Sequence, residues 1–80
     1  MSRIKAVSVK PLEDYKLLLE FSDGEKRIFD CSPYLNGDWF SELKDISKFE
    51  TVHIAGLSVE WAGGQDLCPD CLYEQSVIVA

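Results

Sequence analysis

The first thirty residues alternate between apolar and polar positions with the period-two spacing of β-strands. The clearest example is Tyr15–Phe21, in which every second side chain is a large apolar or aromatic one. The β-branched run Ile4–Val9 predicts an earlier strand, which we expect Pro11 and the Glu13-Asp14 pair to close. An Asp-Gly turn at Gly24 predicts a hairpin into a third strand, Lys26–Cys31, because this dipeptide tolerates positive φ. The pattern therefore predicts a three-stranded antiparallel meander.

The spacing changes from strand-like to helical after Cys31, and the predicted elements become short. Ser32 is placed to cap one helical turn, with Pro33 in its first position. Asp38 is placed to cap a second short helix, Trp39–Lys44, whose apolar residues share one face. Asp45–Phe49 has the pattern of a further single turn. The middle of the chain is therefore expected to contain only short helical segments.

The last thirty residues predict two more strands and a helix. The strands are expected at Thr51–Ile54 and Leu57–Trp61, and the helix at Pro69–Gln75. The apolar tail Ser76–Ala80 is uncharged and β-prone, so we expect it to lie against its own sheet or against a second copy in a homodimer. The fold class is α+β: one domain over residues 1–80, with an antiparallel β-meander, short helices, two further strands and a C-terminal capping helix.

Charge is distributed unevenly along the 80 residues, which carry 8 basic and 14 acidic side chains and a formal net charge of −6. Residues 1–30 balance 6 basic against 6 acidic side chains, whereas residues 31–80 hold 2 against 8. No lysine or arginine follows Lys48. Nucleic-acid binding depends on cations that displace phosphate counterions, so the sequence argues against direct DNA or RNA contact. An acidic surface instead favours a basic protein partner.

Hydropathy gives no sign of a membrane segment. No apolar run approaches the roughly 18–20 residues that a membrane span requires. The first five residues are followed by no signal-like apolar stretch. We therefore expect a cytoplasmic protein that does not associate with membranes.

Residues spread over most of the chain form a pattern that resembles a known family. The pattern comprises Tyr15, Leu17, Phe21–Gly24, Phe29, Asp30, Phe40, Leu43, Phe49, Val52, Trp61–Leu67, Pro69, Leu72 and Tyr73. It is similar to domain-of-unknown-function family 2442, which consists of small, mostly bacterial α+β domains. The resemblance implies no established enzyme activity or ligand, and for some members a partner protein in a toxin–antitoxin pair. Cysteines at positions 68 and 71 depart from the family pattern.

Cys68 and Cys71 form the sharpest local motif, a Cys-Pro-Asp-Cys sequence at the predicted start of the last helix. Two thiols at this spacing can form a disulfide, and a helix N-terminus lowers a thiol pKa. We expect Asp66 and Asp70 to oppose this by raising the pKa of the thiols. Thiol redox chemistry is one alternative for this pair, and two small side chains on a short helix are the other.

Zinc binding is a further alternative that involves the same two thiols. Together with Cys31 and His53 they supply three thiolates and one imidazole, a ligand set that zinc accepts. Cys31 and His53 are isolated in the sequence and must converge from separate strands. Lone cysteines commonly act as small hydrophobes. His53 lies between two apolar residues of a strand and is expected to face solvent.

The function that this sequence favours is a small accessory or protein-binding domain rather than an enzyme, with no cofactor. It would be an acidic, antitoxin-like partner that masks a basic protein, and residues 38–74 would provide the contact. Aromatic and acidic side chains in this segment suit a protein interface. The interaction candidates are Asp38, Trp39, Glu42, Asp66, Asp70, Tyr73 and Glu74.

Overall fold

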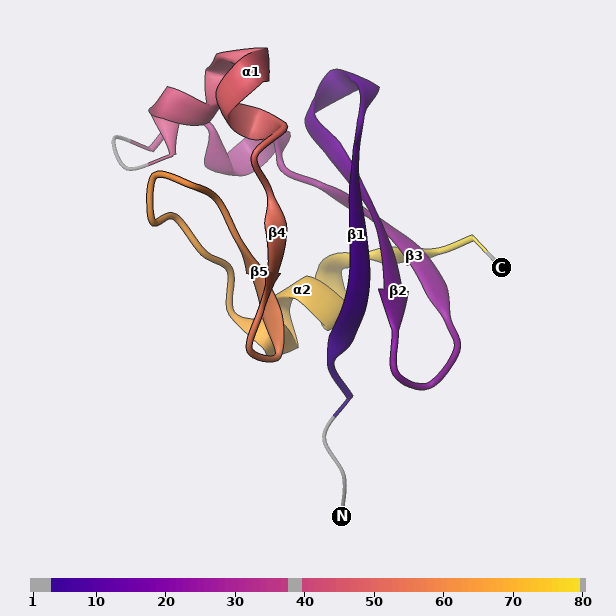
Figure 1. Ribbon diagram of the computed structural model, residues 1–80. Coiled ribbons are helices and arrows are strands. Elements are labelled where there is room, and N and C mark those ends of the chain that lie inside the picture. Colours follow the sequence, from indigo (N-terminus) through magenta and orange to yellow (C-terminus); the bar gives the residue numbers. More distant parts are fainter. Residues whose placement is uncertain (1–3, 38–39, 80) are drawn as a thin grey trace.

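The computed structural model describes residues 4–37 and 40–79 of the chain, which form a mixed α+β domain (Figure 1). Its larger sheet contains β1 (Ala6–Leu12), β2 (Lys16–Phe21), β3 (Lys26–Asp30) and β6 (Val77–Ile78), in the spatial order β1-β2-β3-β6. All neighbouring strands of this sheet run antiparallel. The predicted meander is confirmed, and the C-terminal tail lies against its own sheet.

The period-two pattern of β2 determines which face of the sheet is covered. Leu17, Leu19 and Phe21 are buried, and Leu17 lies opposite the buried Phe29 of β3. Gly24 has a φ of 90° in the turn between β2 and β3, a conformation that glycine adopts without steric cost. The inner face of the meander therefore provides a continuous apolar wall for the rest of the chain.

The first strand and its connection differ from the sequence prediction. β1 continues through Pro11 to Leu12, so Pro11 does not close the strand, whereas the Glu13-Asp14 pair directly follows its end as predicted. β1 is an edge strand, where a missing N–H removes no necessary ladder hydrogen bond. Tyr15 also lies outside β2, in the short helix η1 (Glu13–Tyr15), with a φ of 60°. Its ring packs edge-on against Phe49, with 5.4 Å between ring centroids.

Three short helical segments connect the meander to the rest of the domain. They are η2 (Ser32–Tyr34), η3 (Ser41–Lys44) and α1 (Ile46–Phe49). Cys31 rather than Ser32 occupies the cap position of η2. Within the described residues, the second helix is shorter than predicted and begins at Ser41, and positions 38 and 39 lie outside them. Asp45 caps α1, because its carboxylate accepts a hydrogen bond from the Ser47 N–H at 3.0 Å.

A two-stranded hairpin and one helix complete the fold. The hairpin pairs β4 (His53–Ala55) with β5 (Ser58–Glu60), and the helix α2 spans Pro69–Gln75 as predicted. Both hairpin strands are shorter than predicted. In Figure 1 α2 runs from the β4–β5 hairpin towards the four-stranded sheet.

One apolar core joins the meander to the hairpin and α2. Trp61 is 1% exposed at the centre of this core, and its indole N–H donates to the Phe49 carbonyl at 2.9 Å. Leu72 of α2 is fully buried. The other buried apolar residues are Ala6, Leu17, Leu19, Phe21, Phe29, Cys31, Leu35, Leu43, Phe49, Val59 and Leu67. In the part of the chain that the structure describes, no helix is both long and apolar enough to cross a membrane.

Candidate functional site

The acidic residues proposed for protein contact lie on the surface, but on different elements. Glu42 belongs to η3, Asp66 follows the turn after β5, and Asp70 and Glu74 lie on α2. All four side chains are exposed. Glu42 approaches Lys48 at 3.9 Å in an exposed ion pair, which contributes little to stability. Asp38 and Trp39, the two remaining candidates from this part of the sequence, lie outside the described residues.

Tyr73 occupies a different environment from these acids, because it is half-buried between α2 and the β2–β3 hairpin. Its hydroxyl donates to carboxylate oxygens of Asp23 at 3.0 Å and Glu25 at 3.1 Å. These acceptors raise the pKa of Tyr73, the Asp23 hydrogen bond most strongly. The Arg27 guanidinium lies 3.9 Å from the centre of the Tyr73 ring, a cation–π contact. Tyr73 therefore links α2 to the meander through these hydrogen bonds and the cation–π contact.

The thiols of Cys68 and Cys71 are exposed, reduced and adjacent at the start of α2. Backbone N–H groups of Cys71 and Asp70 point at the Cys68 sulfur and lower the pKa of that thiol. The hydrogen bond with Cys68 and the charge of Cys68 raise the pKa of Cys71. The expectation that aspartates raise both thiol pKa values is wrong for Cys68, where the backbone donors outweigh the Asp70 charge.

The four proposed zinc ligands do not come together. Cys31 is buried in the core beyond β3, and burial raises the pKa of its thiol to about 12. His53 is exposed on β4, as its position in the strand predicted. Among the described residues, which include all four candidates, no three histidine, cysteine or acidic side chains form a group that could hold a metal ion.

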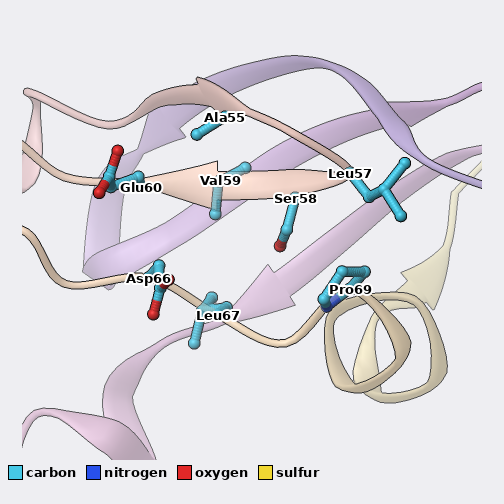
Figure 2. Close-up of a pocket in the computed structure, with 8 residues that line it drawn as sticks. All are labelled: Ala55, Leu57, Ser58, Val59, Glu60, Asp66, Leu67 and Pro69. Atoms are coloured by element: carbon cyan, nitrogen blue, oxygen red, sulfur yellow. The ribbon is translucent and has the colours of Figure 1, made fainter.

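A groove between β5 and the segment that leads into α2 is the feature that sequence reasoning missed (Figure 2). Its volume is about 230 Å³. Residues 57–60 form one wall, and Asp66, Leu67 and Pro69 form the other. An isolated antiparallel bridge between Glu60 and Asp66 holds the two walls together at one end. The groove is therefore a feature of the backbone arrangement and not only of side-chain positions.

The side chain of Ser58 is the notable polar group of this groove. Ser58 is 5% exposed, and its hydroxyl has no hydrogen-bond partner among the described residues. In Figure 2 the hydroxyl points from β5 towards the opposite wall at Leu67 and Pro69. A buried hydroxyl without a partner costs about 1–3 kcal/mol. The position of Ser58 is therefore not explained by stability alone.

Two carboxylates lie at the bridged end of the groove. Glu60 and Asp66 are directly opposite each other, an arrangement in which like charges destabilise antiparallel pairs. The imidazole Nε2 of His53 lies 3.5 Å from the Glu60 carboxylate, an ion pair only when His53 is protonated. Asp66 makes no ion pair with any of the described residues. This end of the groove therefore has the charge arrangement that attracts a cation.

A second hollow, of about 440 Å³, lies where η1 meets α1. It is lined by the end of β1, by Glu13 and Asp14, and by Ile46, Phe49 and Glu50. Ile46 is 52% exposed there. This hollow is open and carries no buried polar group without a partner among the described residues.

The fold and surface define a small α+β domain with an acidic C-terminal half. A family model described as "Protein of unknown function (DUF2442)" matches residues 6–77, essentially the whole chain. The chain therefore belongs to the DUF2442 family. Neither the curated proteins nor the solved structures contain a match to it.

Proposed function

We propose that this protein is a cytoplasmic binding domain, and not an enzyme, whose acidic C-terminal half masks a basic protein in the manner of an antitoxin. The observation that carries the proposal is the charge of residues 31–80, which hold 2 basic and 8 acidic side chains. Glu42, Asp66, Asp70 and Glu74 are all exposed on the surface of this half. Opposite charge on a partner accelerates encounter and fixes orientation, so binding should weaken as salt rises.

Charge reversal on the two halves of the molecule tests this proposal. The variant E42K/E74K places two cations in the acidic half, and the matched control E13K/E20K makes the same change of net charge on the meander. All four glutamates are exposed. Each protein is used to recover partners from native lysate at low and high salt, after circular dichroism has shown that it is folded.

The proposal expects the wild type and E13K/E20K to recover the same basic protein at low salt. E42K/E74K should lose it, and high salt should release it from all three. Equal recovery by E42K/E74K and the control, or recovery that does not depend on salt, contradicts the masking function.

A second candidate function, thiol redox chemistry, is supported by one observation. Cys68 and Cys71 are exposed and hydrogen-bonded to each other, and backbone donors lower the pKa of the first thiol. In this proposal the Cys68 thiolate attacks a small disulfide such as oxidised glutathione and releases one glutathione thiol. Cys71 then displaces the second glutathione, which leaves a Cys68–Cys71 disulfide and two glutathione thiols.

Titration against a glutathione redox buffer tests this second candidate. Mass spectrometry should detect the loss of two hydrogens from the native protein and from C31A, but not from C71S. Mixed glutathione adducts that persist at Cys68 in the wild type would contradict formation of the internal disulfide.

A further inference from the structure

The groove between β5 and residues 66–69 has the chemistry of a subsite for one basic side chain (Figure 2). Its volume of about 230 Å³ lies below the roughly 300–1,000 Å³ of pockets that hold whole small-molecule ligands. It is nevertheless several times the roughly 30 Å³ that one water occupies. The size therefore suits a single long side chain.

The polar groups of the groove are all able to accept hydrogen bonds from a cation. Glu60 and Asp66 supply two carboxylates at the bridged end. Ser58 is on β5 two residues before Glu60, so the two side chains leave the strand on the same side. The buried hydroxyl of Ser58, which has no partner among the described residues, adds a third acceptor.

The remaining walls are apolar. Leu67 and Pro69 line the side opposite β5, and Leu57 lies at the far end from the two carboxylates (Figure 2). Lysine and arginine bury their methylene groups along such surfaces while the charged end reaches polar groups. Arginine fits this arrangement best, because its planar guanidinium offers five donors to several acceptors at once.

We infer that this groove binds an arginine side chain of the basic partner. The guanidinium would lie by Glu60 and Asp66, where it would offset the repulsion between two opposed carboxylates, and the Ser58 hydroxyl would accept one of its N–H groups. This inference rests on the proposed masking function, to which it adds the side chain that is recognised. It also gives the unpartnered hydroxyl of Ser58 a role that core packing does not.

The test is an NMR titration of the full-length protein with Nα-acetyl-arginine amide, which carries the side chain without a partner protein. Nα-acetyl-citrulline amide is the matched probe, because it has a similar shape and no charge. Amide shifts should be confined to residues 57–60 and 66–69 and should saturate with the arginine probe only. High salt should weaken the binding.

Two double variants test whether arginine binding depends on the two carboxylates of the groove or on the negative charge of the whole surface. E60Q/D66N should weaken binding of the arginine probe about tenfold, since each neutral side chain removes a charge-assisted hydrogen bond. E42Q/E74Q removes the same number of charges elsewhere and should leave the affinity within about twofold. S58A should weaken binding about threefold and leave the unfolding midpoint unchanged or higher, because it removes a buried hydroxyl without a partner.

Three results would overturn the inference: equal shifts with citrulline, shifts scattered over the acidic surface, or equal losses in E60Q/D66N and E42Q/E74Q. Any of these combined with salt-sensitive recovery of a basic partner would leave the masking function standing without this subsite. Saturable, groove-specific arginine binding by a protein that recovers no basic partner would support the subsite and count against masking.

Discussion

The meander and the C-terminal region, residues 41–79, differ in how regular and how charged they are. The first three strands contain 7, 6 and 5 residues and pair in long ladders, interrupted by one register shift between Ala6 and Ser8 of β1. In the C-terminal region the hairpin strands contain 3 residues each and α2 contains 7. Elements this short hold few hydrogen bonds of their own and depend on packing against a neighbour. We therefore call the meander the scaffold of the fold. The short elements of the C-terminal region depend on packing against it.

The same contrast appears in the surface chemistry. Charges on residues 1–30 balance, whereas no lysine or arginine follows Lys48. Irregular backbone leaves room for features that a regular ladder excludes, such as the groove beside β5 and the turn at Gly64, whose φ is 94°. The acidic surface and the groove are thus carried by the part of the molecule that is least able to fold alone.

Removal of Trp61 gives the largest expected effect, because this large side chain is buried in the core that both regions share. Its ring lies 6.0 Å from Phe49 and 6.1 Å from Phe40, measured between centroids. W61A should lower the free energy of unfolding by about 3–5 kcal/mol, a large fraction of the roughly 5–15 kcal/mol typical of whole domains. Urea denaturation followed by circular dichroism measures the loss, with W61F as the milder control.

Hydrogen exchange on W61A tests whether the meander and the C-terminal region share one cooperative core. If both regions share one core, amides of β2 and β5 should lose protection together. Full protection in β2 with none in β5 would mean that the meander folds independently, and the description of one shared core would be wrong.

Substitution of Arg27 gives the next largest expected effect, because its side chain links the end of α2 to β3 of the scaffold. Its guanidinium donates to the Tyr73 carbonyl at 3.0 Å and the Ser76 carbonyl at 3.3 Å, and pairs with Glu25 at 2.6 Å. The Arg27 side chain is 12% exposed. R27A should cost about 2–3 kcal/mol, measured by urea denaturation, because several charge-assisted contacts are lost.

Lysine at this position provides the control for charge. R27K keeps the cation but loses the forked geometry, so it should recover less than half of the lost stability. A fully stable R27K would show that charge alone, and not the bridge between α2 and β3, is what matters.

Local patterns in the sequence predicted most of the scaffold but little of the groove. Alternation identified β2, and Pro69 in the first turn identified the start of α2. These elements were predictable because the responsible residues lie within a few positions of one another. The extension of β1 past Pro11 was not, because only the finished sheet makes that strand an edge.

The groove was not predictable from the sequence, because it is formed by contacts between residues that are separated along the chain or belong to no recognisable motif. Ser58 and Glu60 share one side of a strand, a signal that was present in the period-two pattern. Their opposition to Asp66 and Pro69 was not readable, because the turn after Trp61 brings the chain back alongside β5. Tyr73 was proposed as an interaction candidate, and its hydrogen bonds to Asp23 and Glu25 were not readable because these partners lie about fifty positions away.

Substitution of Cys31 gives a smaller expected effect, on the pH dependence of the free energy of unfolding. It distinguishes the buried thiol from the exposed ones. Burial raises the pKa of Cys31 from its ordinary value of 9.0 to about 12. The unfolded chain therefore loses this proton first, and stability that is complete below pH 9 declines as the pH rises from 9 towards 12. Between pH 8 and pH 10 the wild type should lose about 1.4 kcal/mol more than C31A.

Urea denaturation of both proteins at several pH values measures this difference. The comparison uses the slope against pH, so the cavity that C31A leaves in the core does not affect the conclusion. Cys68 and Cys71 are present in both proteins, so their contributions to the pH dependence cancel in the difference between the two. Parallel curves would show that Cys31 ionises in the folded state as readily as in the unfolded one.

β6 gives the smallest expected effect, although it belongs to the larger sheet. Val77 is 66% exposed and lies opposite Ile28 at the edge of that sheet. V77K should change the free energy of unfolding by less than about 0.5 kcal/mol, because an exposed edge side chain buries little on folding. Urea denaturation at two protein concentrations tests this. A loss above about 1 kcal/mol, with a wild-type midpoint that rises with concentration, would mean that a second copy covers β6 and that the scaffold is completed by dimerisation.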